Sequence, residues 1–187
     1  RISHLLVAGL ALLTISLGLS PASAIEALGP YLLEGEDWPW KARIDGDSYV
    51  VENLPENGGE NSAERDNSVR YFFVQSDGDG DRAYSVEVNL ERFSDMAGAG
   101  LLYGLSDDPY TYFALVIVPD RTVKLLKRDG DGLRQLMSVS GDRIGPGWNR
   151  VSIVEGGGKF EARVNGNTVA EIEPGGVVGD RVGIWVA

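Results

Sequence analysis

Short apolar runs alternate with turn residues along the second half of the chain. The runs are rich in β-branched and aromatic residues, and Gly, Asp or Asn separates them at intervals of about ten positions. This pattern is typical of antiparallel strands. The clearest turn signal is Asn165-Gly166, which predicts a two-residue type I′ turn. The expected strands are Tyr110–Val118, Thr122–Leu126, Leu133–Met137, Trp148–Val154, Lys159–Val164, Thr168–Ile172 and Arg181–Val186.

Period-2 alternation assigns faces to the strands. In the stretch Arg82–Glu91, the apolar side chains Tyr84, Val86, Val88 and Leu90 share one face, while Ser85, Glu87 and Asn89 share the other. That strand is therefore expected to be half-buried. The stretch Tyr110–Val118 is apolar on both faces, so either a loop or a ligand should cover its second side. The whole pattern predicts an all-β fold, a two-sheet antiparallel β-sandwich.

The first 24 residues have the pattern of a secretory signal peptide. Arg1 supplies positive charge, an apolar stretch follows, and Ala22-Ser23-Ala24 provides the small residues of a cleavage site. The alternative is an uncleaved membrane anchor, but the stretch Leu5–Leu19 would span only about 22 Å as a helix. We therefore expect cleavage, a bacterial secreted or periplasmic protein, and one β-sandwich domain over residues 25–187. Residues 54–67 are expected to form its long surface loop.

Composition narrows the classes of function. The chain has 187 residues, no cysteine and a formal net charge of -11. The lack of cysteine excludes disulfides, thiolate metal sites and cysteine nucleophiles. The negative charge disfavours nucleic acid and anionic membrane surfaces as partners.

The order of motifs between Tyr84 and Val186 resembles the concanavalin A-like lectin/glucanase superfamily. It is most similar to laminin-G-like modules and to DUF1080-like domains of secreted bacterial proteins. The resembling segments are Ala99–Gly104, Tyr110–Leu115, Val123–Arg128, Gly147–Ile153, Phe160–Gly166 and Gly179–Ile184. The resemblance implies a jelly-roll sandwich whose concave sheet often binds carbohydrate, sometimes with calcium.

The sequence offers little for catalysis. Glucanases of this superfamily place two or three carboxylates on one strand, a spacing suited to double displacement. Here Asn89 stands between Glu87 and Glu91, and the only histidine, His4, lies in the predicted signal peptide. We therefore predict a protein that is not an enzyme and needs no cofactor.

Three carboxylates at alternating positions, Asp77, Asp79 and Asp81, form a possible calcium site. Calcium prefers such oxygen-rich loops. The alternative is a plain hairpin turn that uses Asp and Gly for their backbone preferences.

A carbohydrate site needs aromatic rings and polar partners for hydroxyl groups. The candidate ligand-binding residues are Glu87, Asn89, Tyr110, Tyr112 and Trp185. The alternative for the aromatic members is a second apolar layer beneath a loop. Trp38, Trp40 and Trp148 are expected to pack in the core or at corners.

These patterns predict a non-catalytic extracytoplasmic binding module, with an oligo- or polysaccharide as its partner and no membrane association after signal cleavage. Two alternatives stay open: a glycan-active hydrolase of the DUF1080-like kind, and a structural or adhesion protein that binds another protein.

Overall fold

The structure is a computed structural model of the chain, and it describes residues 10–12, 34–37, 40–46, 48–53, 70–75, 82–90, 97–156, 159–172 and 179–187. Within these ranges every regular element is a strand, and no helix is present that could cross a membrane. The strands are β1 (Leu10–Leu12), β2 (Gly35–Asp37), β3 (Trp40–Asp45), β4 (Ser48–Asn53), β5 (Arg70–Gln75), β6 (Arg82–Asn89), β7 (Ala99–Asp107), β8 (Tyr110–Val118), β9 (Thr122–Asp129), β10 (Gly132–Ser140), β11 (Asn149–Gly156), β12 (Lys159–Val164), β13 (Asn167–Ile172) and β14 (Arg181–Val186).

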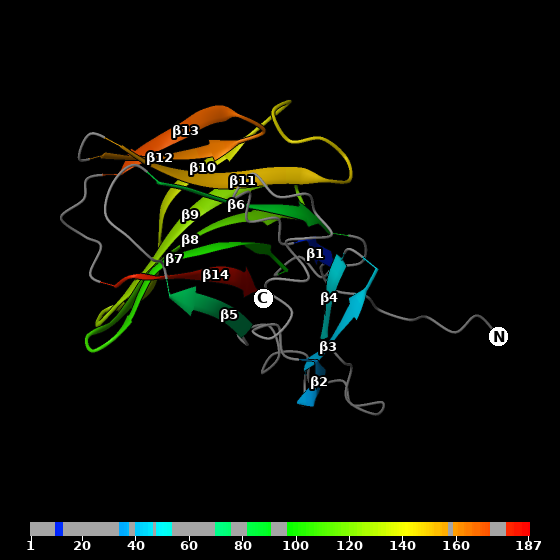
Figure 1. Cartoon of the computed structure of the whole chain (residues 1–187). Coiled ribbons are helices and arrows are strands. Elements are labelled where there is room, and N and C mark those ends of the chain that lie inside the picture. The colour runs from blue at the N-terminus through cyan, green and yellow to red at the C-terminus, as the bar shows by residue number, and fades with distance from the viewer. Residues whose placement is uncertain are drawn as a thin grey trace.

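The strands form two antiparallel sheets (Figure 1). The eight-stranded sheet has the order β13-β12-β11-β6-β1-β4-β3-β2, and the six-stranded sheet has the order β10-β9-β8-β7-β14-β5. Strands far apart in the chain are neighbours: β6 pairs with β11, and β14 lies between β5 and β7. The predicted all-β fold, a sandwich of two antiparallel sheets, is confirmed.

Alternate side chains of both sheets fill the space between them. Val86 and Val88 of β6 and Val151 and Ile153 of β11 face Leu101 of β7 and the neighbouring strands of the opposite layer. Aromatic rings also link the layers, because Tyr103 of β7 contacts Tyr84 of β6 and Phe160 of β12, with ring centroids 6.0 Å and 5.5 Å apart. The face assignment for the stretch Arg82–Glu91 therefore holds in its described part.

Hairpin chemistry sets the register between neighbouring strands. Asn165 and Gly166 have φ of 49° and 82°, as a type I′ turn requires, and Val164 pairs with Asn167 across the turn. The predicted turn between β12 and β13 is therefore confirmed.

Strand β1 lies inside the segment predicted to be a signal peptide. Leu10 pairs with Val50 of β4 on one side and with Asn89 of β6 on the other. Removal of residues 1–24 would take away this shared neighbour of β4 and β6. The signal peptide and the domain limits stay predictions, and residues 54–67, Trp38, Asp77, Asp79 and Asp81 lie outside the described residues.

Gly100 permits an unusually close approach of β7 and β8. A Cβ atom built at Gly100 would lie 2.0 Å from the Leu115 carbonyl oxygen and 2.7 Å from the Val116 Cα. Both atoms belong to the backbone of the central pair, so they cannot move without disturbing the sheet. A residue with a Cβ atom would not fit at this position, so glycine is required.

Gly100→Ala is expected to lower the free energy of unfolding by about 1–3 kcal/mol, because the added methyl group overlaps the backbone of β8. Urea unfolding followed by circular dichroism measures this loss. Gly130→Ala is the matched control, since no atom lies within 4 Å of its added Cβ. Equal stability of the two variants would contradict the steric role of Gly100.

Candidate functional site

The five predicted ligand-binding residues lie on opposite sides of the sandwich. Tyr110 and Tyr112 belong to β8 and Trp185 to β14, all in the six-stranded sheet, whereas Glu87 and Asn89 belong to β6 in the eight-stranded sheet. All five alternate with core residues, so they point to the two outer faces and away from one another. The five candidate residues therefore do not come together in one site.

The outer face of the six-stranded sheet is a second apolar layer. The Tyr112 side chain is 3% exposed and that of Trp185 is 4% exposed, and both pack with Leu102, Ala114 and Val116. The indole Nε1 of Trp185 is buried without a hydrogen-bond acceptor, so no polar group of the described chain orients this ring. The alternative interpretation of these rings as covered core is thus correct for Tyr112 and Trp185.

Tyr110 lies at the rim of this layer and is 38% exposed. Its ring meets that of Tyr112 edge-on, with centroids 5.8 Å apart, and the Arg128 guanidinium lies 5.8 Å from the Tyr110 centroid. Only one tyrosine of the predicted pair is therefore accessible to a ligand.

Tyr112→Ala is expected to reduce the free energy of unfolding by about 3–5 kcal/mol, the usual cost of removing a buried aromatic ring. Tyr110→Ala, at the exposed end of the same strand, serves as its control and should change stability by about 1 kcal/mol or less. Thermal and urea unfolding of both variants provide the comparison. A fully stable Tyr112→Ala protein would mean that the ring does not support the fold.

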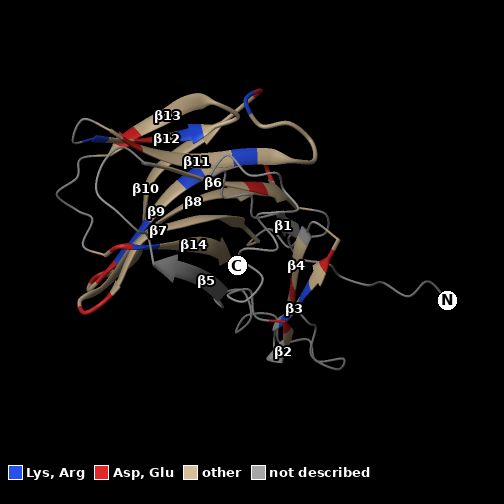
Figure 2. Ribbon diagram, viewed as in Figure 1, with Lys and Arg blue, Asp and Glu red and all other residues tan. Residues whose placement is uncertain are grey.

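The outer face of the eight-stranded sheet is polar and carries a Glu–Arg pair across β6 and β11. Arg150 pairs in register with Glu87, and its Nε and Nη2 donate to the same carboxylate oxygen, Oε1, at 3.2 Å and 2.8 Å. Figure 2 shows the acidic segment of β6 beside the basic segment of β11. Both side chains stay accessible, with 29% of Glu87 and 51% of Arg150 exposed. Glu87 Oε2 and Arg150 Nη1 have no partner in the described structure and stay available to a ligand.

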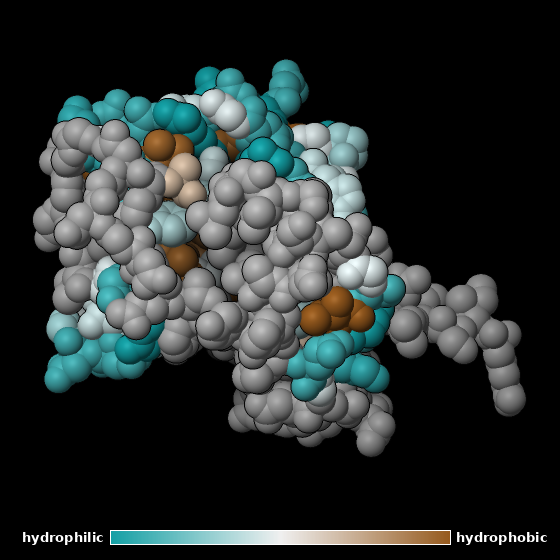
Figure 3. Space-filling view, viewed as in Figure 1, coloured by the Kyte–Doolittle hydropathy of each residue, from teal (hydrophilic) through white to brown (hydrophobic). Residues whose placement is uncertain are grey.

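A second Arg–Glu pair lies on β12, two strands from β6, and a hydroxyl group of β13 joins it. Arg163 donates from Nε and Nη2 to Oε2 of Glu161, at 2.9 Å and 2.7 Å, and the Thr168 hydroxyl donates to the same oxygen at 3.0 Å. These hydrogen bonds, first from Arg163 and then from Thr168, hold the pKa of Glu161 below its usual value. Glu161 Oε1 is left open in the described part of the chain. Figure 3 shows hydrophilic residues gathered over the side of the molecule formed by these strands.

Trp148 is an aromatic side chain at the surface of the molecule. It was expected to pack in the core or at a corner, but it is 43% exposed and directly precedes β11. Asn149 points inward and Arg150 outward, so the same alternation, continued one position, puts Trp148 on the side of Arg150 and Asn89. Trp148 lies three positions before Val151, so the two side chains belong to opposite faces of a strand. Because the inward direction of Val151 was predictable, the outward direction of Trp148 was predictable too.

These residues define what we call the polar face: Asn89, Glu87, Arg150, Ser152, Arg163, Glu161 and Thr168, with Trp148 at one end. Of the five predicted residues, Glu87 and Asn89 belong to it. Arg150, Arg163 and Glu161 had not been singled out, because each is an ordinary charged residue on an alternating strand. Arg150 meets Glu87 through cross-strand register, whereas Arg163 meets Glu161 two positions away on the same strand.

Arg163→Gln is expected to raise the pKa of Glu161 toward its ordinary value, because the largest cause of the lowering is removed. A lowered native pKa means that ionised Glu161 favours folding above the ordinary pKa and that this contribution is lost as pH falls through the native pKa. In the variant this contribution is smaller, and its loss is complete at a higher pH. Carboxyl-carbon NMR titration of Glu161 measures the shift.

Arg134→Gln is the control for this titration, since Arg134 pairs with Asp129 on another sheet. It should leave the Glu161 titration unchanged. A Glu161 midpoint that does not move in Arg163→Gln would show that Arg163 does not set this pKa.

Among the described residues, no group of three or more His, Cys, Asp or Glu side chains is placed to hold a metal ion. The calcium prediction concerns Asp77, Asp79 and Asp81, outside those ranges, and stays a prediction.

Comparisons with known proteins relate the chain to solved structures only. No family model and no curated protein sequence matches it. A carbohydrate-binding module of the CBM66 group from Bacillus subtilis is 12% identical with a TM-score of 0.48, over 62% of this chain and 73% of the module. Sheep galectin-11, in complex with glycerol, is 8% identical with a TM-score of 0.43, over 63% and 87% of the two chains. The alginate lyase A1-II′, of polysaccharide lyase family 7, is 13% identical with a TM-score of 0.46, over 97% and 84%.

These likenesses concern the arrangement of strands alone. At such identities and TM-scores they say nothing about a ligand, and the finer resemblance to laminin-G-like or DUF1080-like domains stays a hypothesis. Function is therefore inferred from the side chains of the polar face.

Proposed function

We propose that this chain is a non-catalytic binding module that holds an oligo- or polysaccharide on the polar face of the eight-stranded sheet. The observation that carries the proposal is the pair Glu87–Arg150, which is fixed in place yet leaves one carboxylate oxygen and one guanidinium nitrogen open, beside the exposed Trp148.

The chemistry of a sugar matches these groups. A hydroxyl group both donates and accepts, so it can donate to Glu87 Oε2 and accept from Arg150 Nη1. Nε and Nη2 of Arg150 already donate to Glu87 Oε1, so the two side chains need little further ordering when a ligand binds. The C–H face of a sugar ring can stack on an exposed indole such as Trp148.

Spacing along the sheet favours an extended ligand. Glu161 and Arg163 repeat the same chemistry on β12, with β11 between them and Glu87. Neighbouring strands lie about 4.8 Å apart, so Glu87 on β6 and the Glu161–Arg163 pair on β12 are about 10 Å apart across the sheet, roughly the length of two sugar residues. This geometry supports an oligosaccharide over a single sugar.

A glycan-active hydrolase is the alternative within glycan chemistry. Its general acid would need a raised pKa, so that it carries a proton to the leaving group at neutral pH. Here the pKa of Glu161 is lowered by its hydrogen bonds from Arg163 and Thr168, so this carboxyl does not suit that role. This observation favours binding over hydrolysis.

A protein-binding role would need a receptive surface elsewhere. The edge strand β10 exposes Leu133 and Leu136, which is the best candidate among the described strands. However, its pairing with β9 shifts between Gln135 and Met137, and such irregularity at an edge discourages addition of a partner strand. We therefore place this role second.

The proposed setting is extracytoplasmic, in a bacterium. It is supported by the signal-like pattern of residues 1–24 and by the acidic composition, which suits a soluble protein without nucleic-acid partners.

A glycan array probed with the purified protein tests the proposal, followed by calorimetric titration of any oligosaccharide that binds. Arg150→Gln is expected to weaken binding by about tenfold or more, since it removes a charged hydrogen-bond donor and releases Glu87. Trp148→Ala should weaken it by about tenfold through loss of stacking.

Leu133→Ala is the control for Trp148, because both side chains are exposed to a similar degree but Leu133 lies on the other sheet. Arg134→Gln is the control for Arg150. Binding that survives both Trp148→Ala and Arg150→Gln would place the site elsewhere. Release of reducing sugar from a bound polysaccharide would instead establish the hydrolase.

A further inference from the structure

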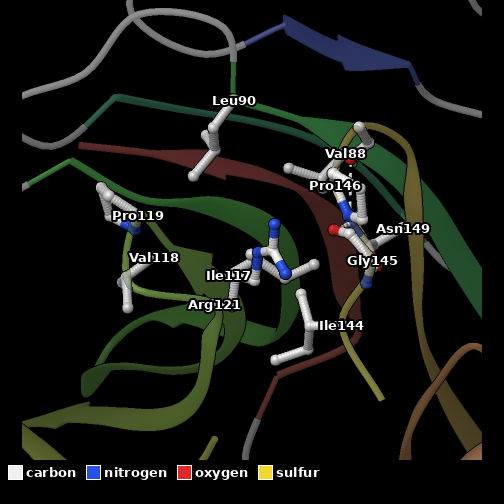
Figure 4. Close-up of a pocket in the computed structure, with 11 residues that line it drawn as sticks. Val88, Leu90, Ile117, Val118, Pro119, Arg121, Ile144, Gly145, Pro146 and Asn149 are labelled. Atoms are coloured by element: carbon white, nitrogen blue, oxygen red, sulfur yellow. Dashed lines mark hydrogen bonds between the residues drawn. The ribbon is translucent and has the colours of Figure 1, made fainter. Parts of the chain in front are cut away.

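A recess lies at one end of the sandwich, and no residue of the polar face lines it. It has a volume of about 300 Å³ and opens where β6 and β8 end, beneath the loop between β10 and β11 (Figure 4). This volume equals that of about ten water molecules, enough for a small ligand. Its walls are aliphatic and include Val88, Leu90, Ile117, Val118, Ile144 and Pro146.

The wall formed by the β10–β11 loop is held rigidly by the buried Asn149. The Asn149 amide oxygen accepts from Gly145 N at 2.8 Å and from Asn165 Nδ2 at 2.9 Å, while its nitrogen donates to the carbonyls of Gly145 and Gly147 at 3.0 Å and 2.9 Å. Every hydrogen-bonding position of this amide is used. The recess is therefore preformed, and Asn149 has nothing to offer a ligand.

Arg121 is the other polar side chain of the lining, and no acidic residue lines the recess in this strongly acidic protein. Its guanidinium points into the recess among the aliphatic side chains (Figure 4). In the described structure this guanidinium makes no hydrogen bond or ion pair, whereas Arg43, Arg134, Arg150, Arg163 and Arg181 each pair with a carboxylate.

The backbone of Arg121 is also unusual. Residues 119–121 form a three-residue hairpin loop between β8 and β9, closed by the Arg121 N–H to the Val118 carbonyl at 3.1 Å. Its last residue has φ of 57°, a left-handed conformation that glycine adopts most easily in such loops. An arginine there costs about 1 kcal/mol, and strain of this kind is concentrated at functional positions.

We propose that this recess binds a small aliphatic carboxylate, with its carboxylate on Arg121 and its hydrocarbon chain against the aliphatic walls. A single guanidinium matches one carboxylate through two parallel hydrogen bonds. A phosphate group would find no second cationic side chain in the lining, and a sugar would find no aromatic ring. The volume suits an acid of about eight carbons.

Titration calorimetry with sodium octanoate tests the proposal, and one molecule should bind per chain. Affinity should rise by about fourfold for each methylene group from butyrate to octanoate. Octan-1-ol and inorganic phosphate should each bind at least about tenfold more weakly than octanoate, because each lacks one of the two recognition elements.

Arg121→Gln and Arg121→Gly are the informative variants, and both should weaken octanoate binding by about tenfold or more. Arg121→Gly should also leave the melting temperature unchanged or raise it, since glycine relieves the left-handed backbone. Failure to fold therefore cannot explain its loss of binding. Arg134→Gln is the control and should bind octanoate normally. Arg134 lies on β10, near the turn of the β9–β10 hairpin and at the other end of β9 from Arg121.

Octanoate binding that is unchanged in both Arg121 variants would overturn the proposal, as would octan-1-ol that binds as tightly as octanoate. Tighter binding of glucuronate than of octanoate would show that the recess selects polar acids. These outcomes do not depend on the polar face, so Arg150→Gln and Trp148→Ala should bind octanoate like the unaltered chain.

Discussion

Packing of the inward-facing side chains between the two sheets is the interaction on which the rest of the structure depends. Each strand directs every second residue into this space, so the other half of its residues must be placed on an outer face. The burial of Val86 and Val88 therefore fixes the direction of Glu87 and Asn89. In the same way, the burial of Val151 fixes the direction of Arg150.

The outer faces of the two sheets differ in polarity. On the six-stranded sheet, Tyr112, Val116 and Trp185 form a second apolar layer, so the central strand β8 is buried on both sides. On the eight-stranded sheet, Glu87 of β6 pairs with Arg150 of β11, and Glu161 pairs with Arg163 along β12. Among the residues that the structure describes, a preformed set of outward hydrogen-bonding groups lies on the polar face, which is why the proposed saccharide site is placed there.

The ends of the sandwich are built differently from its two outer faces. Where strands stop, loops must close the core, and the β10–β11 loop does so with the fully engaged amide of Asn149. The neighbouring hairpin instead presents Arg121 from a left-handed backbone. The apolar recess lies between these loops and is lined by the ends of β6 and β8.

The fold was predictable from sequence because its signals are local. Alternation along the stretches Arg82–Leu90 and Lys159–Val164 reports burial directly, and Asn165-Gly166 reports a turn whose dihedral angles few other residue pairs adopt. The candidate site was less predictable. Glu87 and Asn89 were placed correctly on an outer face, but they were joined to Tyr112 and Trp185, which lie on the opposite layer.

The sequence by itself determined the strands in the second half of the chain, their inward residues and the sandwich architecture, since period 2 and turn chemistry depend only on neighbouring positions. Tertiary structure alone decided which outer face is covered, which carboxylate meets which arginine, and where Arg121 points. Glu87 and Arg150 are 63 positions apart, and only the pairing of β6 with β11 brings them to 2.8 Å. Alternation reports that a side chain faces outward, but it contains no information about what lies opposite.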